Sequence, residues 1–263
     1  GGLFLYKTKK MDLAGIISCA GVFSVFFGFM YGSFFGFEDV LKAIWLKPMN
    51  QMMDVPLVGR LNAVFVIAIG FGMFIILICM VFNIINSIRR GDTEKTWFDS
   101  NAVAGLVFYG SIVLTIGLFI SGKKLPAAAI LVIMFGVPLL LMFLKEPLTN
   151  LVEKKSKILP EQKGMFFVQS FFELFEVLLS YLSNTLSFLR IGAFAVSHAA
   201  MMEVVLMLAG ATNGGNPNWI VVVLGNIFVC AMEGLIVGIQ VLRLEYYEIF
   251  SRFYAGNGRE FKP

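Results

Sequence analysis

The sequence predicts an all-α membrane protein, a polytopic bundle of about six transmembrane helices. Of its 263 residues, 58% are hydrophobic and only 14% are charged, and the mean hydropathy is +0.83. Soluble domains carry charge on about a quarter of their residues, so an ordinary soluble domain is excluded. The chain also contains uncharged runs that reach or exceed the roughly 20 residues a helix needs to cross a bilayer.

Four runs of ordinary span length come first in the chain. They cover residues 13–37, 61–85, 101–121 and 125–144. We expect them to form a four-helix membrane scaffold over residues 1–144. Because the chain opens with Gly1 and Gly2 and no initiator Met, we interpret its start as lying partway through an apolar segment.

Two longer apolar runs follow, at residues 165–211 and 219–250, and the polar turn 212–218 separates them. At about 1.5 Å per residue, the first of them would extend to roughly 70 Å as one helix, more than twice the hydrocarbon thickness. It is therefore either one long, tilted helix or two spans.

The distribution of basic residues decides between these alternatives. With one crossing per run, most of the 21 Lys and Arg residues lie on the side of the amino terminus. They are Lys7, Lys9, Lys10, Arg89, Arg90, Lys95, Lys145, Lys154, Lys155, Lys157, Lys163, Arg252, Arg259 and Lys262. The opposite side holds Lys42, Lys47, Arg60, Lys123 and Lys124. Because cytoplasmic loops are enriched in Lys and Arg, we prefer six crossings with both termini in the cytoplasm.

This topology assigns two further segments. Residues 145–164 are expected to form a cytoplasmic loop, since they mix charges with Pro147 and Pro160. Residues 38–46 are expected to form a short amphipathic helix in the outer interface, with Trp45 as its anchor.

The composition also bounds the chemistry. Cys19, Cys79 and Cys230 all lie inside apolar runs, and the single His198 cannot complete a zinc site with them. No Gly-x-x-x-x-Gly-Lys-Ser/Thr motif for nucleotide phosphates occurs. We therefore expect no metal, no cofactor and no catalytic site in this chain. The net charge of +4 reflects membrane loops, so a nucleic-acid partner is not expected either.

A polar stripe runs along residues 169–190. Its members recur in steps of four and three, which places them on one helix face: Gln169, Glu173, Glu176, Ser180, Ser183, Ser187 and Arg190. A charge at the bilayer centre costs about 3 kcal/mol, so this face cannot point at lipid. It must contact water, another helix or a partner.

The last apolar run carries a shorter counterpart. Its members are Asn226, Cys230, Glu233, Val237, Gln240, Arg243 and Tyr247. Arg190 and Arg243 lie at similar separations from the polar turn, so an antiparallel pair of helices would hold both near mid-membrane. The polar groups then form two half-paths. Glu173, Glu176, Ser180 and Ser183 lie on the cytoplasmic side of Arg190, and His198, Glu203, Asn226 and Glu233 lie on the far side.

An arginine between two half-paths has a defined electrostatic effect. Arg stays protonated in proteins, so it is a fixed charge and not a stage in a proton wire. It repels a cation that would run straight through, and it favours the ionised form of a carboxylate brought near it. Such an arrangement suits a machine in which ions travel on a moving carrier.

Two motifs resemble a known family. The run Leu-Ser-Tyr-Leu-Ser-Asn-Thr-Leu-Ser-Phe-Leu-Arg at 179–190, continued by Ile-Gly-Ala-Phe-Ala-Val-Ser-His-Ala-Ala at 191–200, looks like the signature of the stator membrane subunit of rotary V-type and A-type ATPases. That subunit is called a in vacuolar enzymes and I in prokaryotic ones. The segment from Met232-Glu233-Gly234 through Leu242-Arg243-Leu244 to Gly256-Asn257-Gly258 resembles the last helix and terminus of the family. Ile191-Gly192 points toward the prokaryotic branch.

The resemblance implies roles for particular residues. Arg190 would be the essential arginine that faces the ion-binding carboxylate of the rotating proteolipid ring, and Arg243 would be its partner. Glu176, Ser180 and Ser183 match positions of the cytoplasmic half-channel. His198 and Glu233 match the opposite half-channel, which the half-path reasoning extends to Glu203.

The resemblance also implies a setting. Residues 165–263 would be two long, tilted helices at the ion-translocation interface, in a multi-pass protein of the prokaryotic cell membrane. The partners would be the proteolipid ring, membrane lipid and other stator subunits, the last through an amino-terminal cytosolic domain that this sequence lacks. The ion would be H⁺ or Na⁺. A secondary transporter or channel without a rotor, and a purely structural membrane scaffold, are the alternatives that the polar stripe leaves open.

Overall fold

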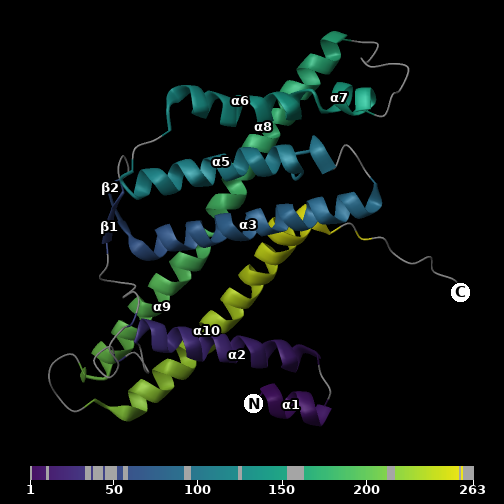
Figure 1. Cartoon of the computed structure of the whole chain (residues 1–263). Helices are drawn as coiled ribbons and strands as arrows, with labels where there is room; N and C mark the ends of the chain where they lie inside the picture. Colours follow the sequence, from purple (N-terminus) through teal and green to yellow (C-terminus); the bar gives the residue numbers. More distant parts are fainter. Residues whose placement is uncertain are drawn as a thin grey trace, which may run out of the picture. The chain divides into compact units, whose positions relative to one another are not determined.

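The computed structural model is built almost entirely of helices (Figure 1). It describes residues 2–9, 12–32, 37, 44, 52–55, 59–91, 96–123, 126–152, 163–211, 217–254 and 256. The helices are α1 (Gly2–Lys9), α2 (Asp12–Tyr31), α3 (Ala63–Arg90), α5 (Val103–Ile120), α6 (Ala128–Phe143), α7 (Lys145–Val152), α8 (Lys163–Ser187), α9 (Leu189–Leu208), α10 (Trp219–Leu244), the π-helical segment η2 (Glu245–Phe250) and α11 (Ser251–Phe253). Two short strands, β1 (Met52–Val55) and β2 (Gly59–Asn62), pair with each other. The predicted all-α membrane class is confirmed.

Five helical stretches of the described chain are long and apolar enough to cross a membrane. They are Ala14–Tyr31, Ala63–Arg90, Val103–Ile120, Gly164–Leu208 and Trp219–Phe253. The pair α6 and α7 adds a sixth if its two helices, bent by 73°, form one span. These stretches follow the predicted apolar runs, and the first long run corresponds to a single 45-residue stretch.

The segment predicted as a cytoplasmic loop differs at its start, because residues 145–152 form the helix α7. Pro147 does not prevent this, since it lies in the first turn, where a backbone N–H has no helical acceptor. The rest of that segment up to residue 162, the interfacial helix predicted at 38–46 apart from Ile44, and the turn up to residue 216 lie outside the described residues.

The chain divides into two compact units. The first unit comprises Gly1–Asp54, Arg60–Val66 and Gly192–Val237, and the second comprises Val55–Gly59, Ile67–Ile191 and Gly238–Pro263. In the first unit, Met202 and Val205 of α9 pack with Val229 of α10. Gly225 permits this close approach, because a Cβ at that position would overlap the Val205 side chain.

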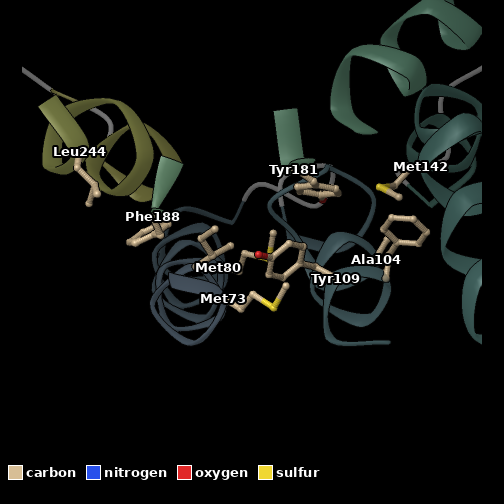
Figure 2. Packing of buried hydrophobic residues seen from close by; sticks show 10 residues of the cluster. Met73, Met80, Ala104, Tyr109, Met142, Tyr181, Phe188 and Leu244 are labelled. Carbon is tan, nitrogen blue, oxygen red and sulfur yellow. The ribbon is translucent and has the colours of Figure 1, made fainter. Parts of the chain in front are cut away.

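In the second unit, α3, α5 and α6 lie across α8 (Figure 1). Their shared core contains Met73, Ile76 and Met80 of α3, Ala104, Phe108 and Tyr109 of α5, Met142 of α6, Tyr181 of α8, and Phe188 and Leu244 (Figure 2). Lipid tails are as apolar as these side chains, so van der Waals packing and hydrogen bonds hold such helices together, and small residues let them approach closely. Gly105 is one of them, because a Cβ there would meet the Ser100 carbonyl and the Tyr181 hydroxyl.

Candidate functional site

The polar stripe of α8 lies on the exposed face of this helix. The exposed members include Gln169, Glu176, Ser180 and Ser183. The buried residues of the same helix are Phe166, Ser170, Tyr181 and Thr185. Large apolar residues such as Phe172, Leu179 and Leu186 are also exposed beside the stripe. The chain thus presents a row of polar groups within an apolar surface, and its own core packs against the other side.

Hydrogen bonds connect several members of the stripe. Gln169 Nε2 donates to Glu173 Oε1 over 3.1 Å, and Lys145 Nζ of α7 lies 2.8 Å from Glu173 Oε2. Asn184 Nδ2 donates to Ser180 Oγ over 3.2 Å. Glu173 is therefore held in an ion pair with Lys145 of α7.

Arg190 follows a break in the helix. α8 ends at Ser187 and α9 begins at Leu189, so Phe188 lies between them. The Phe188 N–H donates to the Thr185 carbonyl over 3.3 Å, and the Ile191 N–H donates to the Phe188 carbonyl over 3.0 Å. These three-residue bonds tighten the turn.

The guanidinium of Arg190 has unused donor capacity. Its Nη1 atom is buried and makes no hydrogen bond within the described part of the chain. A buried charged donor without an acceptor is unfavourable, so this atom favours an anionic or strongly polar partner.

Arg243 is exposed and lies at the end of α10, directly before the π-helical segment η2. Such segments are rare and occur frequently at functional sites. Leu244, the next residue, and Phe188, two residues before Arg190, belong to the same buried core. Both predicted arginines therefore adjoin one supporting core, while their equal membrane depth stays a prediction.

In the first unit, α9 and α10 bring His198 and Glu233 together. His198 Nδ1 lies 2.5 Å from Glu233 Oε2, and the two side chains are 45% and 16% exposed. Glu233 Oε1 is buried and makes no hydrogen bond to described residues. An imidazole and a carboxylate at this distance can pass a proton between them, and the partly exposed ring gives access to it. The sequence placed both residues on one half-path, but their direct contact is a finding of the structure.

The other predicted residues are distributed differently. Glu203 is exposed on α9. Asn226 Nδ2 donates to the Val222 carbonyl of its own helix over 2.9 Å, so its amide is partly used locally. Gln240 Oε1 is buried without a hydrogen-bond partner among the described residues.

The sequence reasoning missed a buried polar network around Arg252. The charge pattern assigned this residue to the terminal loops, but the structure leaves it only 6% exposed. Its Nη1 donates to Asn101 Oδ1 over 3.0 Å, its Nε donates to the Glu248 carbonyl over 3.2 Å, and its guanidinium carbon lies 5.8 Å from the centre of the Tyr181 ring. No local signal in the sequence marked this network, because Arg252 Nε bonds a backbone carbonyl, which any residue at position 248 would provide, and Asn101 lies 151 residues away.

The geometry defines a polytopic membrane protein that presents polar and charged groups on an exposed helix face. Residues 145–263 match the V-type ATPase 116 kDa subunit family. The A-type ATP synthase subunit I of Saccharolobus solfataricus is 44% identical over 98 residues, which are 34% of this chain and 14% of that protein. That of Pyrococcus horikoshii is 25% identical over 271 residues, 98% of this chain and 36% of that protein. The V-type proton ATPase subunit a3 of Arabidopsis thaliana is 36% identical over 107 residues, 37% of this chain and 13% of that protein.

The family match confirms the resemblance that the two motifs predicted, and it covers the carboxyl-terminal part of the chain. The chain spans 36% of the length of the Pyrococcus horikoshii relative, which it matches along nearly its whole extent.

Proposed function

We propose that this chain is the membrane part of a rotary ATPase stator, and that it guides H⁺ or Na⁺ past the proteolipid ring of the rotor. The observation that carries the proposal is the exposed polar stripe of α8, which leads to Arg190, whose buried Nη1 makes no hydrogen bond to any described residue. A face of this kind needs a partner inside the membrane, because lipid cannot solvate its polar groups. The family relationship supports a ring carrying carboxylates as that partner.

Arg190 is the residue that discharges the ring. A ring carboxylate that moves beside a fixed guanidinium is favoured in its ionised form, so it releases its proton or cation there. The guanidinium also blocks direct passage of a cation between the half-channels. Each ion that crosses makes about 2.3 kcal/mol available per 100 mV of membrane potential. Arg243 assists from the last long helix as a second fixed cation.

Two half-channels give ions access to the ring. The cytoplasmic one uses Glu176, Ser180 and Ser183 of the exposed stripe. The opposite one uses the His198–Glu233 pair, with Glu203 as a further carboxylate. In the pair, Glu233 accepts a proton and His198 relays it, since the two atoms lie within hydrogen-bond distance.

The proposal includes the setting of the protein. Residues 1–144 form a membrane scaffold, 145–164 a cytoplasmic connection, and 165–263 the translocation interface, in a prokaryotic cell membrane with both termini in the cytoplasm. The further partners are other rotary ATPase subunits and membrane lipid. Nucleotide chemistry takes place on those other subunits.

Replacement of Arg190 by Ala in the assembled enzyme tests the proposal. ATP-driven ion transport should be lost while the enzyme still assembles, and Arg89→Ala, at the exposed end of α3, should behave as wild type. Full ATP-driven transport in the Arg190→Ala enzyme would overturn the proposal. Copurification with a two-helix, carboxylate-bearing proteolipid is expected as well.

The rotor-free alternative makes a different prediction. A secondary transporter or channel should carry ions in purified vesicles under an ion gradient alone, whereas a stator without its ring should be tight. Gradient-driven flux through the purified chain would therefore favour the alternative.

A further inference from the structure

We propose that Phe188 and Gly72 are positioning residues that set the direction of Arg190. The Phe188 side chain is fully buried, with 0% of its surface exposed, against α3. Gly72 of α3 provides the space, because a Cβ at that position would overlap the Cβ, Cγ and Cδ2 atoms of Phe188. This inference rests on the proposed role of Arg190.

The turn before Phe188 is fixed to a different helix. The Thr185 hydroxyl donates to the Tyr181 carbonyl over 2.7 Å, so the Tyr109 hydroxyl of α5 must be the donor in its 2.7 Å bond to Thr185 Oγ1. The Tyr181 hydroxyl in turn donates to the Ser100 carbonyl. The end of α8 is thereby held to α5 through Thr185 and to α3 through Phe188, which fixes its rotation about its own axis.

That rotation determines where Arg190 points. Two residues are separated by about 200° around the axis of an α-helix and by about 240° in the tighter three-residue turn found at Phe188, so a Phe188 ring held against α3 turns Arg190 away from α3 in either case. This is the side on which the stripe residues Ser180 and Ser183 are exposed. By holding Phe188, the space beside Gly72 thus directs the Arg190 side chain toward the face proposed to meet the ring.

The same support extends to the second arginine. Leu244, next to Arg243, is 7% exposed and belongs to the core that contains Met73, Met80 and Phe188. In Figure 2, Phe188 lies between Leu244 and Met80. α3 is therefore a common base for both arginine-bearing segments.

The test compares two glycines of α3 in the full-length protein within the assembled enzyme. Gly72→Ala forces the Phe188 ring out of the space beside Gly72, whereas Gly70→Ala adds a methyl group that meets no described atom within 4 Å. We expect Gly72→Ala to lower the number of ions transported per ATP hydrolysed about tenfold or more, because a displacement of about 1 Å in a working group can cost up to ~100-fold. Gly70→Ala should match the wild type.

The readout is normalised to assembled enzyme, and the thermal unfolding midpoint is measured in parallel. Wild-type ion-to-ATP ratios in Gly72→Ala would overturn the inference. If Gly72→Ala does not assemble, Phe188→Leu decides, since it introduces no extra atoms: a reduced ratio supports the inference and an unchanged ratio overturns it.

Arg190→Ala is measured beside them. If it retains full transport, the proposed function fails; if it is inactive while both positioning variants behave as wild type, the positioning role alone fails.

Discussion

The surroundings of Arg190 and of the His198–Glu233 pair differ in how many packed side chains and hydrogen bonds support them. Around Arg190, the described core of the second unit combines side chains from α3, α5, α6, α8 and α10. Hydrogen bonds of the Tyr109 and Tyr181 hydroxyls also connect α8 to its neighbours. In the first unit, the described core cluster consists of Met202, Val205 and Val229, and the nearby His198 ring is 45% exposed.

This difference fits the roles proposed for the two sites, a fixed positive charge at Arg190 and proton transfer at the His198–Glu233 pair. A permanent guanidinium acts through its position, so it benefits from a rigid base that holds its direction. A pair that takes up and releases protons needs contact with water as well as with its partner, so partial exposure is an advantage. Substitutions at Arg190 or in the pair should therefore mainly affect transport, and substitutions in the core beneath the arginines should mainly affect stability.

Of the substitutions in the pair and in the core, Glu233→Gln is expected to have the largest effect. Gln keeps a similar shape but cannot accept the proton, so transport should fall about 100-fold, the lower end of what a positioned acid–base group contributes. The thermal unfolding midpoint should hardly change. Ion transport by the assembled enzyme measures this, with Glu203→Gln, at an exposed carboxylate of α9, expected to have a smaller effect. Unchanged turnover in Glu233→Gln would remove the pair from the ion path.

Arg252→Ala should mainly reduce stability. It leaves Asn101 Oδ1 without its charged donor and removes a buried guanidinium from beside the Tyr181 ring, at a cost of about 2–3 kcal/mol. Thermal unfolding in detergent should show a lower midpoint for Arg252→Ala. Arg89→Ala, on the exposed end of α3, should leave the midpoint unchanged. An unchanged midpoint in Arg252→Ala would contradict a structural role for this network.

Gly105→Ala should destabilise the contact of α5 with α8. The new methyl group would meet the Ser100 backbone carbonyl, which cannot move as a side chain would, and overpacking of this kind costs about 1–3 kcal/mol. Gly117→Ala in the same helix adds a methyl group that meets no atom of the described chain within 4 Å, so it is the matched control. Equal unfolding midpoints of the two variants would show that the close approach at Gly105 has no energetic weight.

Tyr181→Phe should have the smallest effect of the four. It removes one hydroxyl that donates to the Ser100 carbonyl and leaves the aromatic packing in place, so a loss of about 1 kcal/mol is expected. The same unfolding measurement tests it. A loss as large as that of Arg252→Ala would mean that the hydroxyl, more than the guanidinium, organises the network.

Much of the fold could be predicted because the bilayer imposes simple rules. A segment inside the membrane must satisfy its own backbone hydrogen bonds, so each uncharged run of sufficient length becomes a helix. The predicted run 101–121 corresponds to α5 at Val103–Ile120, and 61–85 corresponds to α3 at Ala63–Arg90. The polar stripe could also be recognised from the sequence, because its seven polar residues recur with the period of an α-helix.

Other features have no local signal. The break at Phe188 has neither Pro nor Gly at the break itself to announce it, and depends on a glycine of another helix. The burial of Arg252 depends on Asn101, which lies 151 residues away in the chain. Proximity to the carboxyl terminus made Arg252 look like a loop charge, yet its neighbours in space are the buried Tyr181 ring and the half-buried Asn101 amide.

The sequence by itself determined that this is a helical membrane protein, which family it resembles, and where charged residues interrupt its apolar runs. Those properties follow from hydrophobic run length, from helical period and from motifs that are contiguous in the chain. Only the tertiary structure decided that His198 contacts Glu233, that the α8 stripe faces outward and that Phe188 occupies the space beside Gly72. These depend on how helices distant in sequence pack, and side-chain shape at each contact sets that packing.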